Sequence, residues 1–363
     1  MKIRNCLLKA MVIIMSLLLL LTGCASGDPL DAGDAAEPET TASTEGGTKK
    51  PSSSSGGSDR DWVKFRNPWE TGIEVEAADG EKINLRRVTI DIDGDKEIKI
   101  YQITDVHFNY LNTQDMNDST IVASSNAWKD IGDNAPIVET FQRCVAYAGN
   151  NQIVVTGDMA NFYSHGNMEL IQRYIFDPAN IMAVAGNHDA TMAGYPKERI
   201  QANMDELSNM FLDDGQSMSY FSKVLDGRVM LIQMDNAAGN DIGASRFSEA
   251  QKTALEADLA KARTKGYAVL LFYHIPLPSK NTNDSMKDYD LGMYTYAGAS
   301  KDVYDLITNN ADIIKGCFAG HTHADSYSDI MAKTADGKKA VIPQYVLSAL
   351  YLGKGDMTEI IIK

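Results

Sequence analysis

Short apolar runs separated by polar and Gly-containing segments recur along the chain from about residue 62 onward. Runs rich in Val, Ile, Leu and Phe that are bounded by turn-forming residues are typical of β-strands. Strands are expected at Ile83–Ile92, Glu97–Ile103, Gln152–Thr156, Ile181–Ala185, Tyr220–Val224, Val229–Met234, Ala268–Tyr273, Ile313–Ala319, Val341–Leu347 and Glu359–Ile362. Most of these runs are short.

Helices are expected between some of the strands. Pro136–Ala148 has Pro in its first turn, and Ser248–Lys265 begins with a good N-cap residue and carries Leu255 and Leu259 on one face. Strands interleaved with helices predict an α/β layered domain. Because no internal repeat and no later low-complexity break occurs, residues 61–363 are expected to form one domain.

Residues 1–24 have the pattern of a secretory signal. Basic residues precede the apolar run Ala10–Leu21, whose 12 residues are too few to cross about 30 Å of hydrocarbon comfortably as a helix. The alternative is an uncleaved membrane anchor. Leu21-Thr22-Gly23-Cys24 resembles a bacterial lipobox, in which the cysteine is acylated and becomes the mature N-terminus. This resemblance implies an extracytoplasmic protein that is lipid-anchored to the bacterial cell membrane through Cys24.

Residues 25–60 consist largely of Gly, Ser, Thr, Ala, Pro and acidic residues and contain no aromatic side chain. Such a segment cannot bury enough apolar surface to offset the entropy lost on ordering. It is expected to be a disordered linker that holds the domain away from the membrane.

Composition and charge narrow the possible partners. The chain has 363 residues with 44% hydrophobic and 23% charged residues, so the domain can build an ordinary core. A formal net charge of −15 disfavours nucleic acid as a partner, since that binding depends on a basic surface. Outside the signal and Cys24, only Cys144 and Cys317 remain, and their apolar neighbours favour buried thiols over a disulfide.

Asp, Asn and His residues gather directly after five of the expected strands. Five of the six histidines in the chain occupy such positions. The carboxyl ends of strands are where α/β sheets place their ligand sites. The residues concerned are Asp105, His107, Asp158, Asn187, His188, Asp189, His274, His321 and His323.

The residue types at these strand ends suit a pair of divalent metal ions. Carboxylate and amide oxygens combined with imidazole nitrogens favour Mn, Fe, Zn, Co or Ni over calcium, and no cysteine belongs to the set. Residues two apart in an extended segment project to the same side, which explains the Asp105-Val-His107 and His321-Thr-His323 spacing. Glycines before Asp158, Asn187 and His321 leave room for a tight cluster.

Together these motifs resemble the calcineurin-like metallophosphoesterase family, whose ordered blocks are D-x-H, G-D, G-N-H-[DE], a single H, and G-H-x-H. All five blocks occur here in order, across about 220 residues. Each block is short, but the ordered set is highly specific. The resemblance extends from Glu97 to Lys363 and implies an α/β fold in which a two-layer β-sandwich is flanked by helices.

The same resemblance implies roles for the matching residues. One metal would be held by Asp105, His107, Asp158 and His323, and the other by Asp158, Asn187, His274 and His321. His188 would act on the substrate, and Asp189 would orient its imidazole. A hydroxide bridging the metals would attack a phosphate monoester or diester, and His188 would stabilise charge or protonate the leaving oxygen.

Several residues outside the blocks remain open between site and scaffold. Asn161 could orient a ligand, line the pocket or cap a turn, and it stands where purple acid phosphatases carry a tyrosine that binds iron, which disfavours that subclass. His165 is expected in a surface loop rather than in contact with substrate. Tyr294 and Tyr296 belong to a polar stretch that is either a specificity loop or ordinary packing.

Two other classes of protein compete with a phosphoesterase. A tethered ligand-binding lipoprotein would also have an acylated cysteine and a linker, but it would not need five metal-ligand blocks in order. A metal-bound but inactive relative would not need His188 and Asp189. The sequence therefore favours an enzyme that acts on a small phosphate ester.

Overall fold

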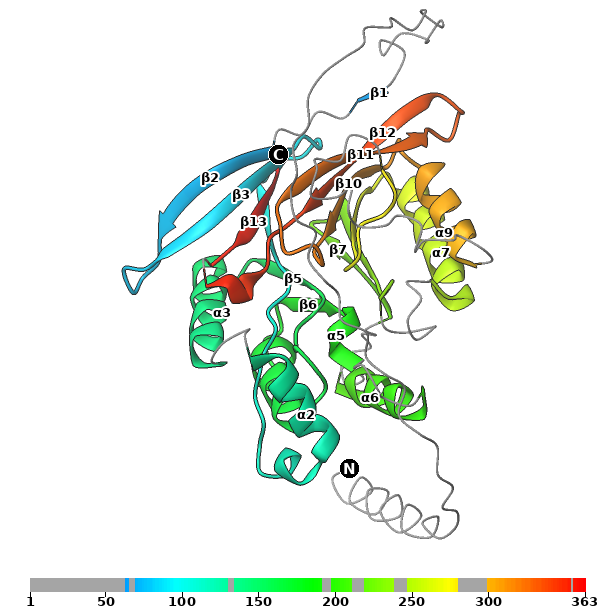
Figure 1. Cartoon of the computed structure of the whole chain (residues 1–363). Helices are drawn as coiled ribbons and strands as arrows, with labels where there is room; N and C mark the ends of the chain where they lie inside the picture. The colour runs from blue at the N-terminus through cyan, green and yellow to red at the C-terminus, as the bar shows by residue number, and fades with distance from the viewer. Residues whose placement is uncertain are drawn as a thin grey trace, which may run out of the picture. The chain divides into compact units, whose positions relative to one another are not determined.

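The computed structural model describes residues 63–64, 69–129, 134–190, 197–210, 219–237, 247–279, 299–353 and 355–363 (Figure 1). All of them belong to the unit Gly57–Lys363. The expected signal segment, linker and Cys24 lie outside the described residues, as do Tyr294 and Tyr296. Within the described ranges, no helix combines the length and the apolar character needed to cross a bilayer.

The first sheet combines strands from the amino-terminal part of the described chain with its last strand. Its strands lie in the order β2 (Trp69–Glu76), β3 (Lys82–Ile90), β13 (Met357–Ile362), β4 (Ile98–Ile103), β5 (Gln152–Thr156) and β6 (Ile181–Val184). The strands β4, β5 and β6 are parallel, whereas β13 is antiparallel to β4 and parallel to β3. The carboxyl ends of β4, β5 and β6 therefore meet at one edge.

A second sheet is built from later parts of the chain. Its strands lie in the order β1 (Val63–Lys64), β12 (Lys339–Val346), β10 (Ile314–Ala319), β9 (Ala268–Phe272), β8 (Val229–Met234) and β7 (Tyr220–Leu225), and β11 (Ser326–Lys333) pairs with β12. The strands from β12 to β8 are parallel, and β7 and β11 are antiparallel to their neighbours.

Helices complete the secondary structure of the described residues. They are α2 (Ser119–Ala127), α3 (Asn134–Ala148), α4 (His165–Ile171), α5 (Asn187–Ala190), α6 (Lys197–Met210), α7 (Glu249–Lys265) and α9 (Ala299–Thr308). A π-helical turn follows α4 at Gln172–Phe176, and short 3-10 turns occur at η2 (Asp115–Asn117) and η7 (Leu350–Leu352).

Three buried apolar clusters define the layers. One lies between the sheets and contains Ile100 and Val154 from the first sheet and Leu270 and Phe272 from the second. Another joins the first sheet to α3, α4 and α6, and a third joins the second sheet to α7 and α9, which lie side by side in Figure 1. This arrangement confirms the expected two-layer β-sandwich flanked by helices.

The two cysteines of the described domain are free and buried. Cys144 lies in the cluster under α3, and Cys317 lies on β10 in the cluster under α7. Burial raises the pKa of each thiol to about 12, so both behave as apolar side chains. The expectation of buried thiols rather than a disulfide is confirmed.

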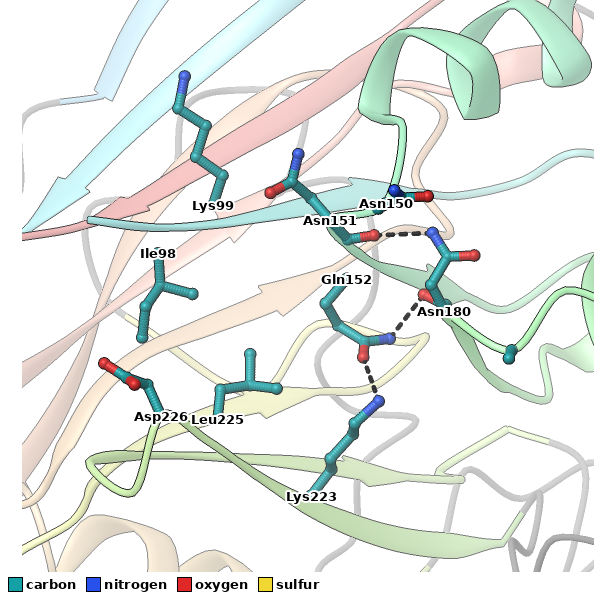
Figure 2. A pocket seen from close by; sticks show the side chains of 10 residues that line it. Ile98, Lys99, Asn150, Asn151, Gln152, Asn180, Lys223, Leu225 and Asp226 are labelled. Atoms are coloured by element: carbon teal, nitrogen blue, oxygen red, sulfur yellow. Dashed lines mark hydrogen bonds between the residues drawn. The ribbon is translucent and has the colours of Figure 1, made fainter. Parts of the chain in front are cut away.

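A hollow of about 520 Å³ lies at the amino ends of β4 and β5, opposite the edge that carries the Asp and His motifs. Figure 2 shows hydrogen bonds among several of the polar residues that line it. Lys223 Nζ donates to Gln152 Oε1 at 2.7 Å, and Gln152 Nε2 donates to the carbonyl of Asn180 at 2.9 Å. These bonds tie β7 to β5 and serve the fold.

Helix α7 begins with a capping box. Ser248 Oγ accepts from the amide of Gln251, and Gln251 Oε1 accepts from the amide of Ser248 at 2.7 Å. The Gln251 side chain also donates to the carbonyls of Ser219 and Asp235 beside β7 and β8. The cap expected at Ser248 is confirmed, and it also anchors the helix to the second sheet.

Replacing Ser248 by Ala is expected to destabilise the domain by about 1 kcal/mol, because one amide at the helix start loses its acceptor. Urea unfolding of the purified chain measures this change. Thr253→Ala is the control, since Thr253 lies on the exposed face of the same helix and its loss is expected to cost less than about 0.5 kcal/mol. Equal losses in the two variants would contradict a specific cap.

Candidate metal centre

The Asp, Asn and His residues at the strand ends converge where the two sheets face each other. From the first sheet, β4 leads to Asp105 and His107, β5 leads to Asp158, and β6 leads to Asn187. From the second sheet, β9 and β10 contribute the histidines. Main-chain hydrogen bonds join these strand ends, because the amide of Asp105 donates to the carbonyl of Gly157 and that of Gly320 donates to His274.

Two groups of side chains could each hold a metal ion. In each group, one nitrogen or oxygen atom per residue lies within 4.8 Å of every other. Asp158 belongs to both groups. Asn187 Oδ1 lies 3.1 Å from His274 Nε2 and therefore borders the second group. The groups are Asp105, His107, Asp158 and His323, and Asp158, His274 and His321.

Ring nitrogens of the imidazoles in both groups lie close to one another. His107 Nε2 lies 3.2 Å from His323 Nε2, and His274 Nε2 lies 3.3 Å from His321 Nδ1. Their lone pairs would repel at these distances unless a proton or a cation lay between them. The chemistry of this donor set fits a pair of metal ions.

Hydrogen bonds on the far side of each ring hold these nitrogens in place. His107 Nδ1 lies 3.2 Å from Asn161 Oδ1, and His274 Nδ1 donates to the carbonyl of Thr156 at 2.8 Å. In the neutral imidazole, a proton at Nδ1 leaves the lone pair of Nε2 free, and this is the form that binds a metal. The contact with Asn161 therefore agrees with one of the roles left open for that residue, the orientation of a ligand.

In Asp105 and Asp158, one carboxylate oxygen accepts hydrogen bonds from the protein and the other faces the imidazoles of the centre. Asp105 Oδ2 accepts from Thr104 Oγ1 at 2.7 Å and from the amide of His321 at 2.9 Å, while its buried Oδ1 lies 3.1 Å from His323 Nε2. Asp158 Oδ1 accepts from the amide of His188, and its Oδ2 lies 3.2 Å from His274 Nε2. Each carboxylate thus has one oxygen held by the protein and one that faces an imidazole nitrogen, an arrangement that fits a metal ligand.

The pKa values of Asp158 and His274 depend on each other's charge. Burial alone would raise the pKa of Asp158, but the neighbouring imidazoles of His274 and His188 hold it below its usual range, so Asp158 is ionised. Burial lowers the pKa of His274, yet the negative charge of Asp158 outweighs it and raises that pKa to about 10. A metal ion binding here would displace the proton from His274.

Backbone strain is concentrated at these residues. Among the described residues, six other than Gly have positive φ, and five of them belong to the centre, with φ between 48° at Asp158 and 72° at His321. Such conformations cost of order 1–3 kcal/mol each and persist where the surroundings enforce them. Asp105 and His107 are therefore not part of an extended segment, so the expected explanation of the D-x-H spacing by strand alternation is wrong.

Gly186 is required because of the close approach of Asp158. A Cβ atom at residue 186 would lie 2.1 Å from Asp158 Oδ1 and 2.2 Å from the amide nitrogen of the same residue. No other residue type fits without displacing the shared carboxylate. The expectation that these glycines leave room for a tight cluster is confirmed.

His188 lies at the outer side of the first group, with its ring centroid 4.9 Å from that of His107. Its Nδ1 donates to the carbonyl of Asn161 at 2.8 Å. The expected hydrogen bond from Asp189 is therefore wrong. Asp189 turns into the core, where its oxygens accept from the amides of Ala160 and Gly186 at 2.8 and 2.7 Å, because consecutive residues of α5 project in different directions.

His165 does not belong to the cluster. It is the first residue of α4, which Ser164 caps, and its Nε2 accepts from the side chain of Gln114 at 2.9 Å. The expected surface loop at this position is wrong, because the Ser164 hydroxyl starts a helix there. Its ring lies against Tyr163.

Tyr351, on η7, contacts the centre although no sequence signal marked it. Its ring centroid lies 5.0 Å from that of His107 and 5.2 Å from that of His323, and its hydroxyl lies 3.2 Å from His323 Nδ1. It follows His323 by 28 residues and lies in no motif block, so spacing could not reveal it. Trp128, which lies against His188, was also missed.

A family model described as calcineurin-like phosphoesterase matches residues 98–325, more than half of the chain. The chain belongs to this family, which supports a phosphoesterase hydrolase with a dinuclear metal site. A comparison with curated proteins finds no match to the sequence.

Solved structures with similar folds include a dimetal phosphatase from Danio rerio at 14% identity, covering 70% of this chain and 88% of that one with a TM-score of 0.39. The structure of PhoD is 10% identical, with coverage of 76% and 60% and a TM-score of 0.43. The calcineurin-like phosphoesterase YfkN from Bacillus subtilis is 14% identical, with coverage of 70% and 82% and a TM-score of 0.34.

Tyr351→Phe is expected to weaken metal binding by on the order of ten-fold, because His323 loses the hydroxyl that bonds to Nδ1 and holds its ring. Competition with a chromogenic chelator measures the affinity of the purified chain for Mn²⁺ or Zn²⁺. Tyr327→Phe is the matched control, since its hydroxyl bonds only to Asp329 among the partners described and lies in none of the candidate ligand groups. Equal metal affinity in the two variants would contradict this role.

Proposed function

We propose that the chain is a dinuclear metallophosphoesterase that hydrolyses phosphate mono- or diesters at the outer face of a bacterial cell membrane. The observation that carries this proposal is the position of Asp158, which belongs to both candidate ligand groups and whose Oδ2 lies 3.6 Å from His107 Nε2 and 3.2 Å from His274 Nε2. His188 lies beside the first group. In this proposal residues 61–363 form the catalytic domain, residues 25–60 the linker, and residues 1–24 the signal.

The proposed metal ligands are oxygens and nitrogens without any thiolate, which favours Mn, Fe, Zn, Co or Ni. Ions bound there would polarise the phosphate oxygens and lower the pKa of a coordinated water. Asp158 would hold both ions and keep them close together. The seven ligands are Asp105, His107, Asp158, Asn187, His274, His321 and His323.

His188 is the proposed catalytic residue that touches the substrate. Because Nδ1 donates to Asn161, Nε2 is the atom that can carry the transferable proton. When protonated, it would stabilise the charge that develops on phosphate oxygens or donate to the leaving oxygen. The amide of His188 donates to Asp158 Oδ1, so the ring position is linked to the shared ligand.

Asp189 is a positioning residue in this proposal. Its carboxylate joins the turn after Asp158 to the turn before His188 through the amides of Ala160 and Gly186. Burial and the charge of Asp158 raise the pKa of Asp189 to about 8, although the hydrogen bonds from the amides of Ala160 and Gly186 act in the opposite direction. Losing this carboxylate would free both turns that hold the centre.

His188→Ala is expected to retain both metal ions and to lose about 10²–10⁴-fold in kcat, because only the proton donor is removed. Asp158→Ala is expected to lose both metal and activity. Hydrolysis of an aryl phosphate and a bis-aryl phosphate, together with elemental analysis, measures the two effects.

His165→Ala is the control for these variants, since His165 contacts Gln114 and Tyr163. It is expected to leave kcat unchanged. Full activity in His188→Ala, or failure of the wild-type chain to bind metal under any loading condition, would contradict the proposed function.

The proposed tether predicts that Cys24 is acylated. When the full chain is expressed in a bacterium, we expect incorporation of labelled palmitate and partition into the detergent phase. Cys24→Ser should abolish both, whereas Cys6→Ser should change neither, because residue 6 lies in the discarded signal. Release of unlabelled wild-type protein into the medium would contradict lipidation.

A further inference from the structure

Trp128 is an exposed aromatic residue beside the candidate catalytic histidine. Its side chain is 40% exposed, and its ring centroid lies 5.1 Å from that of His188 with an interplanar angle of 70°. Among the described residues, the other exposed large apolar side chains are Tyr110, Met116, Tyr327 and Leu352. Exposure of indole is unfavourable in water, so its placement beside His188 points to a ligand contact.

The protein holds Trp128 in a fixed place. It follows the last residue of α2, and its amide donates to the carbonyl of Ser124 at 3.2 Å. Asp118 caps the start of α2 and accepts from Arg199 of α6 at 2.7 Å, which joins the two helices. The indole therefore belongs to an anchored helix end.

The rings of His107, His188 and Trp128 contact one another in that order. The ring centroids of His107 and His188 are 4.9 Å apart, and those of His188 and Trp128 are 5.1 Å apart. A phosphate held by metal ions at this centre, with its ester oxygen within reach of His188 Nε2, would place its alcohol-side group near His188. The exposed indole of Trp128 lies against the same histidine.

We propose that Trp128 stacks on the alcohol-side group, so that the site prefers phosphate esters carrying a flat aromatic ring near the ester oxygen. This inference rests on the proposed function. Aromatic rings pair favourably when their centroids lie about 4.5–7 Å apart, a gain that a puckered saturated ring of similar size does not receive. The indole is thus a specificity-determining residue.

Binding of two non-hydrolysable phosphonates to the full, Mn²⁺-loaded chain tests the proposal. 2-Phenylethylphosphonate and 2-cyclohexylethylphosphonate share the charged group and the spacer and differ in the flatness of the ring. Calorimetry is expected to show that Trp128→Ala weakens binding of the phenyl compound by on the order of ten-fold and that of the cyclohexyl compound by less than about three-fold. Trp128→Phe should retain most of the difference.

Tyr327→Ala is the matched control, since Tyr327 is 36% exposed and its ring contacts Tyr345 on β12. It should change neither affinity. Equal weakening of both phosphonates in Trp128→Ala would mean that the indole only positions His188 and would overturn the proposal, as would unchanged binding. Because binding is read without turnover, absence of hydrolysis by the wild-type chain would count against the proposed function and not against stacking.

Discussion

The shared carboxylate of Asp158 is the contact on which the site depends. It follows a strand of the first sheet and lies 3.2 Å from His274, which follows a strand of the second, so the contact joins the two sheets. Burying these charged and polar groups is costly unless they are paired. The positive φ of Asp158 and the absence of a side chain at Gly186 allow this approach. A pair of cations shared at this carboxylate would compensate the buried charge.

Much of the fold and the centre could be predicted because both depend on local signals. Continuous apolar runs gave the buried strands, and β5 and β8 occupy the expected residues. β2 was missed because most of its residues are exposed or half-buried, so no apolar run marks it. Helix α9, which spans Ala299–Thr308, was not among the expected helices.

Within the site, the direction of side chains and the contacts between residues far apart in the sequence could not be predicted. Sequence order indicated which residues meet, because parallel strands bring their carboxyl ends together. It could not show that Asp189 turns away from His188, since that depends on the start of α5. It also could not reveal Tyr351 and Trp128, which reach the centre from η7 and from the end of α2.

The proposed function requires two metal ions that share Asp158. X-ray diffraction from crystals of the metal-loaded chain, recorded at the absorption edge of that metal, would locate these ions. We expect two anomalous peaks about 3.5–4 Å apart, both in contact with Asp158. A single peak, or two peaks of which only one contacts Asp158, would contradict this requirement.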